Sequence, residues 1–282
     1  MKVLVTGANG QLGYDVCREL KRRQIPFEGV TSKEFDLVSR TDTRSYVMNC
    51  APDAVIHCAA YTAVDKAEDE PEKCWAVNAD GTRTLAECCR ELGAKMLYIS
   101  TDYVFPGEGD QPYGANDKTG PLSVYGRTKL EGETAVKKIL DTCFIVRTSW
   151  VYGKNGKNFV KTMLQLAEHK IELNVVCDQV GSPTYTADLS PLLCNMVATD
   201  KYGVYHATNE GFCSWAEFAL EIFRLTGKNV RVNAVPTSEY PVRAVRPLNS
   251  RISKDSLEQA GFGRLPHWQD ALGRYLDDVG NI

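Results

Sequence analysis

Residues 2–13 of the chain read Lys2-Val3-Leu4-Val5-Thr6-Gly7-Ala8-Asn9-Gly10-Gln11-Leu12-Gly13. The apolar, β-branched start predicts a strand, and the helical spacing of Val16 and Leu20 beyond it predicts a helix. Between them, Gly7 permits a tight turn, Gly10 lets the backbone approach a pyrophosphate, and Gly13 lets the helix pack on the strand. A turn of this composition can be merely structural, but its place between strand and helix favours a dinucleotide-binding loop.

The remainder of the first half alternates apolar runs with helical patterns. Further strands are predicted at residues 27–31, 54–60, 95–100 and 144–147, with helices at 43–50 and 71–92. Because this alternation is typical of right-handed β-α-β units, we predict an α/β fold with a Rossmann-type, doubly wound parallel sheet. Residues 1–150 are expected to form a dinucleotide-binding domain. Residues 151–282 are expected to form mainly a smaller substrate-binding lobe, with segments that return to the first domain.

Composition favours a small-molecule ligand. The 282 residues include 33 basic and 36 acidic ones, a formal net charge of −3, without a long run of either sign. We therefore expect no nucleic-acid or membrane partner. The apolar runs are too short for a signal peptide or a spanning helix, so a cytoplasmic protein is expected. Ten cysteines and four histidines are scattered without zinc spacing, which predicts buried thiols and no metal site.

The end of the second predicted strand bears on the choice of cofactor. An acidic residue commonly binds the adenosine ribose there. Here the strand runs into Ser32 and Lys33, and Glu28 lies one position early and is expected to face elsewhere. A 2′-phosphate should therefore be tolerated, which makes NADPH at least as plausible as NADH. Asp36 and Leu37 follow, in a position to cover the adenine.

Tyr125 and Lys129 are four residues apart in a segment that reads as helix, so their side chains project from one face. A neighbouring ammonium favours the ionised phenol and brings its pKa down from about 10, which suits acid–base catalysis. Such a pair also occurs by chance in many helices. Thr101 follows the strand predicted at 95–100 and should stand beside that helix, where its hydroxyl can donate to a carbonyl oxygen.

Trp150 allows two interpretations. Burial in a core is the usual fate of a tryptophan, whereas a flat indole can also form the wall of a pocket for a sugar ring or a base. We expect the pocket, because Trp150 follows a strand that ends on the carboxyl side of the sheet.

In their order and approximate spacing, these motifs resemble those of the extended short-chain dehydrogenases. The resemblance covers essentially the whole chain, and its more specific parts are residues 59–68, 100–105, 147–152 and 246–251. These parts are similar to the nucleotide-sugar reductases of dTDP-rhamnose biosynthesis within that superfamily. The resemblance implies that the chain reduces the C4 ketone of dTDP-4-dehydro-L-rhamnose to dTDP-L-rhamnose with NADPH or NADH. It is also compatible with a homodimer.

The resemblance implies roles for individual residues. Tyr125 is expected to protonate the developing alkoxide, Lys129 to lower the pKa of Tyr125 and hold the nicotinamide ribose, and Thr101 to polarise the carbonyl. The expected cofactor-binding residues are Gly7, Asn9, Gly10, Gln11, Leu12, Gly13, Asp36, Leu37, Ala59, Ala60, Tyr61, Thr62, Asn78, Ser100, Tyr125 and Lys129. The expected substrate-binding residues are Thr101, Asp102, Val104, Trp150, Asn158 and Arg246.

Some members of the family are thought to hold a divalent cation through acidic residues at a dimer contact. In this chain the segment after Thr184 is Tyr185-Thr186-Ala187-Asp188, without the expected Glu. No residue is therefore assigned as a metal ligand.

Two other functions fit parts of the pattern. A nucleotide-sugar epimerase or 4,6-dehydratase would share the fold, but the dehydratases place an Asp-Glu pair after the active-site Thr, where this chain has Asp102-Tyr103. An epimerase retains its cofactor through turnover, so stoichiometric consumption of NAD(P)H would exclude it. A non-catalytic regulatory subunit of the same fold is the second alternative, and it would have no need of Thr101, Tyr125 and Lys129 together.

Overall fold

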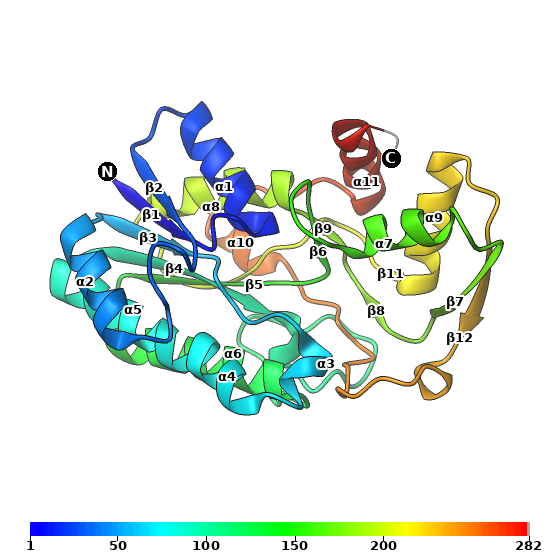
Figure 1. Ribbon diagram of the computed structural model, residues 1–282, viewed down its shortest axis with the longest axis horizontal. Helices are drawn as coiled ribbons and strands as arrows, with labels where there is room; N and C mark the ends of the chain where they lie inside the picture. The colour runs from blue at the N-terminus through cyan, green and yellow to red at the C-terminus, as the bar shows by residue number, and fades with distance from the viewer. Residues whose placement is uncertain (281–282) are drawn as a thin grey trace.

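The computed structural model describes residues 1–280 and is centred on a six-stranded sheet in the order β10-β5-β4-β3-β1-β2 (Figure 1). Every neighbouring pair in this sheet is parallel. Its strands are β1 (Val3–Thr6), β2 (Phe27–Val30), β3 (Ala54–His57), β4 (Lys95–Thr101), β5 (Cys143–Thr148) and β10 (Gly203–His206). The predicted Rossmann-type α/β fold is confirmed. The order reverses between β1 and β3, where doubly wound sheets bind their ligands.

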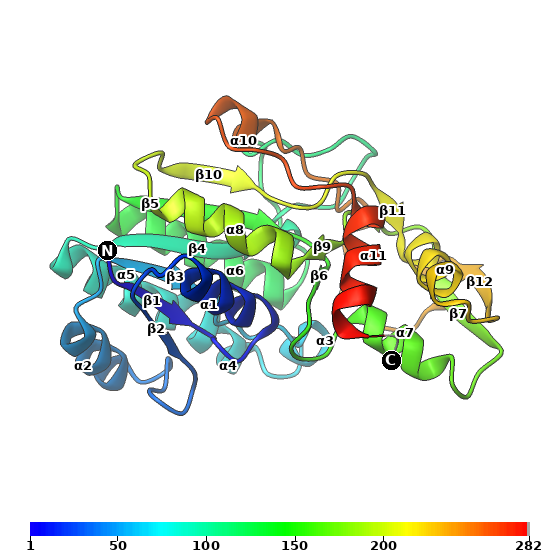
Figure 2. The ribbon, with the colours of Figure 1, turned by 90° about the horizontal axis from the view of Figure 1, so that it is seen from above.

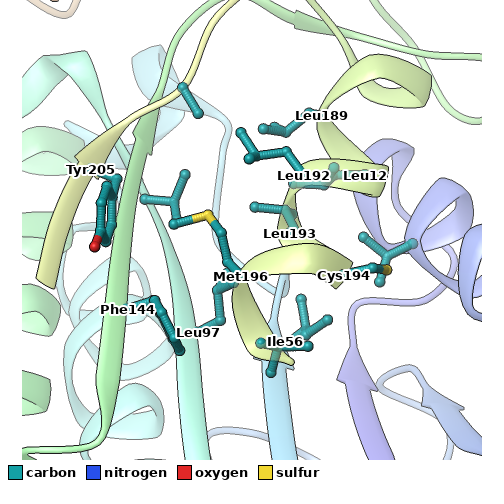
Figure 3. Packing of buried hydrophobic residues seen from close by; sticks show 14 of the residues in the cluster. Leu12, Ile56, Leu97, Phe144, Leu189, Leu192, Leu193, Cys194, Met196 and Tyr205 are labelled. Atoms are coloured by element: carbon teal, nitrogen blue, oxygen red, sulfur yellow. The ribbon is translucent and has the colours of Figure 1, made fainter. Parts of the chain in front are cut away.

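Helices cover both faces of the sheet (Figure 1). On one face lie α1 (Gln11–Arg22) and α8 (Thr186–Val197), and on the other α2 (Arg40–Cys50), α5 (Thr82–Leu92) and α6 (Val124–Ile139). Figure 3 shows Leu193 and Met196 of α8 packed toward Ile56, Leu97 and Phe144 of the sheet. Because both faces are covered, the central strands are buried throughout, as their continuous apolar runs predict.

Some helix boundaries differ from the prediction. The helix expected at 43–50 begins at Arg40, because the Ser39 side chain caps it by accepting a hydrogen bond from the Asp42 N–H. The helix expected at 71–92 is divided into α4 (Pro71–Trp75), the π-helical segment η1 (Ala76–Gly81) and α5. Such a segment often marks a functional region. Here it places Asn78, whose side chain accepts from the Tyr61 N–H at 2.8 Å and donates to the Tyr61 carbonyl at 3.1 Å.

Residues beyond 150 contribute a second group of elements at one end of the sheet (Figure 2). Its buried side chains form a separate apolar cluster that includes Tyr152, Phe218, Trp268 and Tyr275. The elements that contribute to this cluster or border it are β6 (Val151–Tyr152), α7 (Phe159–Leu166), β7 (Glu172–Val176), β8 (Val180–Gly181), β9 (Thr184–Tyr185), β11 (Cys213–Ser214), α9 (Trp215–Thr226), β12 (Arg231–Val235) and α11 (Trp268–Val279). In contrast, α8, β10 and α10 (Asp255–Gln259) pack with the central sheet.

Three short helices complete the fold: α3 (Val64–Ala67), η2 (Asp102–Val104) and η3 (Thr237–Glu239). No helix within residues 1–280 is long and apolar enough to cross a membrane. All ten cysteines are free thiols.

Candidate active site

A cavity of about 840 Å³ opens at the carboxyl ends of β1, β3, β4 and β5 and extends to residues of the second group of elements. Parallel strands bring the residues that follow them to one edge of the sheet, so segments far apart in the sequence meet here. The predicted residues that line it are Gly7, Asn9, Gly10, Gln11, Leu12, Asp36, Leu37, Ala59, Ala60, Thr62, Ser100, Thr101, Asp102, Tyr125, Lys129, Trp150 and Asn158.

The glycine turn at the start of the cavity has the geometry of a phosphate cradle. Gly7 has φ +68°, and a Cβ there would lie 2.8 Å from the Ala59 nitrogen. A Cβ at Gly13 would lie 2.2 Å from the Gly7 carbonyl oxygen. The close packing of the helix on the turn therefore requires glycine at this position, as predicted. The N-cap residue of α1 is Gly10, which has no side chain to accept from the first N–H groups of the helix. These groups are therefore available to an anion. These residues fit a dinucleotide.

At the end of β2, Thr31 and Ser32 line the cavity. Glu28 is directed to Tyr46, which donates a hydrogen bond to it, and to Lys2, whose ammonium is 3.2 Å away. A second nearby carboxylate, that of Glu34, accepts hydrogen bonds of 2.7 Å from the N–H and the hydroxyl of Thr31. Both nearby carboxylates therefore have partners within the protein.

Thr101, Tyr125 and Lys129 all line this cavity. The predicted helix is confirmed as α6, whose Ser123 cap accepts a hydrogen bond from the Gly126 N–H at 3.1 Å. The structure corrects the expected effect on Tyr125. Burial of the phenol raises its pKa, while a contact with Thr101 acts in the opposite direction. A phenol held neutral is a proton donor, which is the role that reduction of a ketone requires.

Lys129 is almost fully buried beneath the cavity. Burial lowers its pKa to about 7, and the negative charge of Glu133 acts against this. The Lys129 nitrogen lies 4.1 Å from the centre of the Tyr98 ring, which also favours the ammonium. Glu133 is itself fixed by a hydrogen bond from Ser100 and by the buried guanidinium of Arg147, at 2.6 and 2.7 Å.

Asp102 brings a buried carboxylate to the wall of the cavity. Its Oδ1 accepts a hydrogen bond from the Thr101 hydroxyl at 2.9 Å, and its Oδ2 is buried without a partner among the described residues. Burial raises the pKa of Asp102 to about 6, and the nearby side chains of Ser250 and Thr101 act in the opposite direction. An orphaned buried oxygen of this kind suits a hydroxyl donor on a ligand.

Comparison with known proteins extends over the whole chain. A model of the family described as the RmlD substrate binding domain matches residues 1–281. The chain belongs to this family. A relative from Sinorhizobium fredii named dTDP-4-dehydrorhamnose reductase is 42% identical and covers 98% of this chain and 97% of its own length.

Two solved structures are similar to this RmlD family member. The crystal structure of a dTDP-4-dehydrorhamnose reductase from Clostridium acetobutylicum is 42% identical, with a TM-score of 0.97 and 99% of each chain covered. That of a dTDP-4-dehydrorhamnose reductase from Bacillus anthracis, in complex with NADP, is also 42% identical, with a TM-score of 0.96 and 98% of this chain and 99% of its own covered.

Some residues predicted for the site lie outside the cavity wall of this RmlD family member: Gly13, Tyr61, Asn78, Val104 and Arg246. Gly13 and Asn78 support the walls through the contacts described above, and the side chain of Val104 is fully buried. Arg246 forms a two-pronged ion pair with Asp65, with nitrogen–oxygen distances of 2.9 and 2.6 Å.

Asn158 and Gln11 line the cavity and also join the glycine turn to the second group of elements. Asn158 caps α7 and donates to Gln11 Oε1 at 3.1 Å and to the Tyr275 hydroxyl at 3.2 Å. Gln11 Oε1 accepts in addition from the Gly153 N–H at 3.0 Å. The two amides thus hold the loop after β6 against the turn.

Sequence reasoning missed several residues of the wall, including Tyr103, Lys157 and Trp215. Tyr103 packs edge-on against Tyr125, with ring centroids 5.6 Å apart. Its position directly after Asp102 was a usable signal. Trp215 carried no such signal, because only the tertiary fold brings the start of α9 to the cavity.

Proposed function

We propose that this RmlD family member reduces the C4 ketone of dTDP-4-dehydro-L-rhamnose to dTDP-L-rhamnose. The observation that carries the proposal is one cavity that holds both the glycine turn and the group Thr101, Tyr125 and Lys129. A regulatory protein would have no use for this combination. The similarity over the full chain to proteins named dTDP-4-dehydrorhamnose reductase supports the same substrate.

The three residues supply the proton that the reduction requires. When bound, the reduced nicotinamide supplies the hydride that reaches the carbonyl carbon. The Thr101 hydroxyl has a single proton, so it turns from Asp102 to donate a hydrogen bond to the carbonyl oxygen and polarise the carbonyl. Tyr125, kept neutral by burial, gives that oxygen its proton. Lys129, with Glu133 and Tyr98 favouring its charged form, stabilises the resulting phenolate and holds the nicotinamide ribose.

The substrate is placed by residues from both parts of the cavity. Asp102 offers its unpartnered oxygen to a sugar hydroxyl, and Trp150 offers an aromatic surface to the ring. We assign residues 1–150 mainly to cofactor binding and residues 151–282 mainly to the substrate. We assign Arg246 to binding the diphosphate of the substrate. Its guanidinium must leave Asp65 to do so.

NADPH is the cofactor that we propose to be used at least as well as NADH. Ser32 lines the cavity at the end of β2, Glu28 is directed to Tyr46, and the carboxylate of Glu34 is bound by the N–H and the hydroxyl of Thr31. A 2′-phosphate would therefore meet a hydroxyl rather than a free carboxylate. The NADP complex of the Bacillus anthracis protein supports this choice.

The direct assay is incubation of the protein with dTDP-4-dehydro-L-rhamnose and NADPH while the absorbance of the reduced nicotinamide is followed. We expect one equivalent of NADPH to be consumed for each dTDP-L-rhamnose formed. Conversion of the substrate to an isomer without net oxidation of NADPH would favour an epimerase. A bound sugar nucleotide without any turnover would favour a regulatory subunit.

We also propose that the protein works in the cytoplasm, where its free thiols would stay reduced. A homodimer is the assembly to test for, by light scattering of the purified protein.

A further inference from the structure

Two tryptophans that are distant in the sequence form a stacked pair in the wall of the cavity. The ring centroids of Trp150 and Trp215 are 3.6 Å apart, and the ring planes differ by 12°. Both side chains line the cavity and both are partly exposed. Phe159 packs on Trp215 from another direction, with centroids 4.6 Å apart. Trp150 therefore has a second aromatic layer against it.

The backbone of Trp150 adopts an unusual conformation to present its indole. Its φ is +48°, in the left-handed region that costs a residue with a side chain roughly 1 kcal/mol or more. Neighbouring contacts hold it there. The Ser149 hydroxyl donates to the Ser182 carbonyl at 2.8 Å, and the Thr184 N–H donates to the Trp150 carbonyl at 3.2 Å. Conformations of this kind persist where the surroundings fix them, often at functional sites.

Gly181 gives the Trp150 ring its space. A Cβ at Gly181 would lie 3.0 Å from Trp150 Cε2 and 2.9 Å from Ser250 Cβ, both too close. Gly181 belongs to β8, which pairs antiparallel with β11, and Trp215 is the first residue after β11. The β8–β11 pair thus leaves room for the Trp150 indole at Gly181 and places Trp215 at the end of β11.

We propose that Trp215 is a positioning residue, which fixes the plane of Trp150 so that its exposed surface orients the apolar C–H face of a deoxy sugar. This inference rests on the proposed function. Aromatic surfaces pair with apolar ligand faces, and an offset of about 1 Å at the reacting atoms can cost about 100-fold in rate. Since Trp150 is partly exposed and has its own flexible side-chain torsions, a rigid second layer limits how far the indole can tilt.

The test compares Trp215→Leu and Trp215→Phe with Trp75→Leu, a control on α4 whose indole is exposed and outside the cavity wall. Calorimetry measures the Kd of dTDP-L-rhamnose, dTDP and NADPH, and kcat is measured beside it. In Trp215→Leu we expect dTDP-L-rhamnose to bind about three- to tenfold more weakly, as for loss of an aromatic contact. The Kd values of dTDP and NADPH should stay within about twofold, and kcat should fall by up to about 100-fold.

Trp215→Phe should restore most of the loss, and Trp75→Leu should match wild type. Gly181→Ala is an independent variant that displaces Trp150 while Trp215 is intact, and it should give the same selective loss for the sugar-bearing ligand. Wild-type values in Trp215→Leu, or an equal loss for all three ligands, would overturn the inference while the proposed function stands. A wild-type protein that neither binds dTDP-L-rhamnose nor reduces its ketone precursor would overturn both.

Discussion

The ammonium nitrogen of Lys129 lies 4.1 Å from the centre of the buried Tyr98 ring. Tyr98 is thus a cation–π partner of Lys129, and Glu133, one helical turn further along α6, adds a negative charge. Both favour the ammonium against the burial that lowers its pKa to about 7.

Tyr98→Leu should therefore narrow the pH range of activity. Loss of the ring removes a stabilisation of the ammonium worth about 0.5–2 kcal/mol, which lowers the pKa of Lys129 further, by up to about 1.5 units. Activity that needs the ammonium should then decline at a lower pH on the alkaline limb of kcat/KM, which reports the free enzyme. Tyr98→Phe keeps the ring and should retain the wild-type limb. An unchanged profile in Tyr98→Leu would show that the ring does not stabilise the charge.

Tyr125→Phe should bind cofactor normally and lose most of its turnover. The ring and its packing against Tyr103 remain, whereas the proton donor is gone. General acid catalysis is typically worth about 10²- to 10⁴-fold. The measurements are kcat and, by fluorescence titration, the Kd of NADPH. Turnover within a few-fold of wild type would remove Tyr125 from the proton-transfer step.

Ser32→Asp should shift cofactor preference toward NADH. The substitution places a carboxylate in the cavity wall at the end of β2, where a 2′-phosphate would be repelled. The ratio of kcat/KM values, NADPH over NADH, should fall at least about tenfold, because like charges in contact cost several kcal/mol. Lys33→Asp, whose side chain is not part of the wall, should shift the ratio in the same direction but less. A wild type that uses only NADH would contradict the assignment of this end of the cavity.

Two buried histidines should make the protein sensitive to acid. Burial lowers the pKa of His57 and of His206 to about 3, and the Arg147 guanidinium beside His206 acts in the same direction. In the unfolded chain both would titrate near 6.5. Between about pH 3 and 6.5 the unfolded state thus binds more protons, so stability rises with pH and is lost on acidification through this window.

Each histidine should lower the free energy of unfolding by roughly 2 kcal/mol between pH 6.5 and 5. Urea unfolding at the two pH values measures this loss. His206→Gln should remove part of the pH dependence. The control His169→Gln, which replaces a histidine with 81% of its side chain exposed, should leave it unchanged. Equal pH dependence in wild type and His206→Gln would mean that His206 is not held neutral.

The parts of the site that the sequence predicted are those fixed by local patterns. Gly7, Gly10 and Gly13 follow a strand and precede or begin a helix, so one short segment of sequence is enough to predict their role. Tyr125 and Lys129 share a helix face because of their spacing alone. The strand ends at Thr101 and Trp150 could be placed because apolar runs end there, and parallel strands end together.

The remaining features depend on tertiary contacts. Trp215 reaches the cavity only because β11 pairs with β8, and Arg246 is held by Asp65 across 181 positions of the chain. The π-helical segment places the Asn78 side chain where it bonds both the N–H and the carbonyl of Tyr61. The direction of the Tyr125 pKa shift was predicted wrongly, because burial, which no residue spacing reveals, raises that pKa.

Transfer of a hydride from bound nicotinamide to C4 of the sugar can be followed by deuterium labelling. The protein is incubated with dTDP-4-dehydro-L-rhamnose and NADPH that carries two deuterium atoms at C4 of the nicotinamide, and the product is examined by NMR and mass spectrometry. We predict dTDP-L-rhamnose with one deuterium at C4 of the sugar and an equal amount of oxidised cofactor. Unlabelled product, or a labelled cofactor that remains fully reduced while the sugar is converted, would contradict the account.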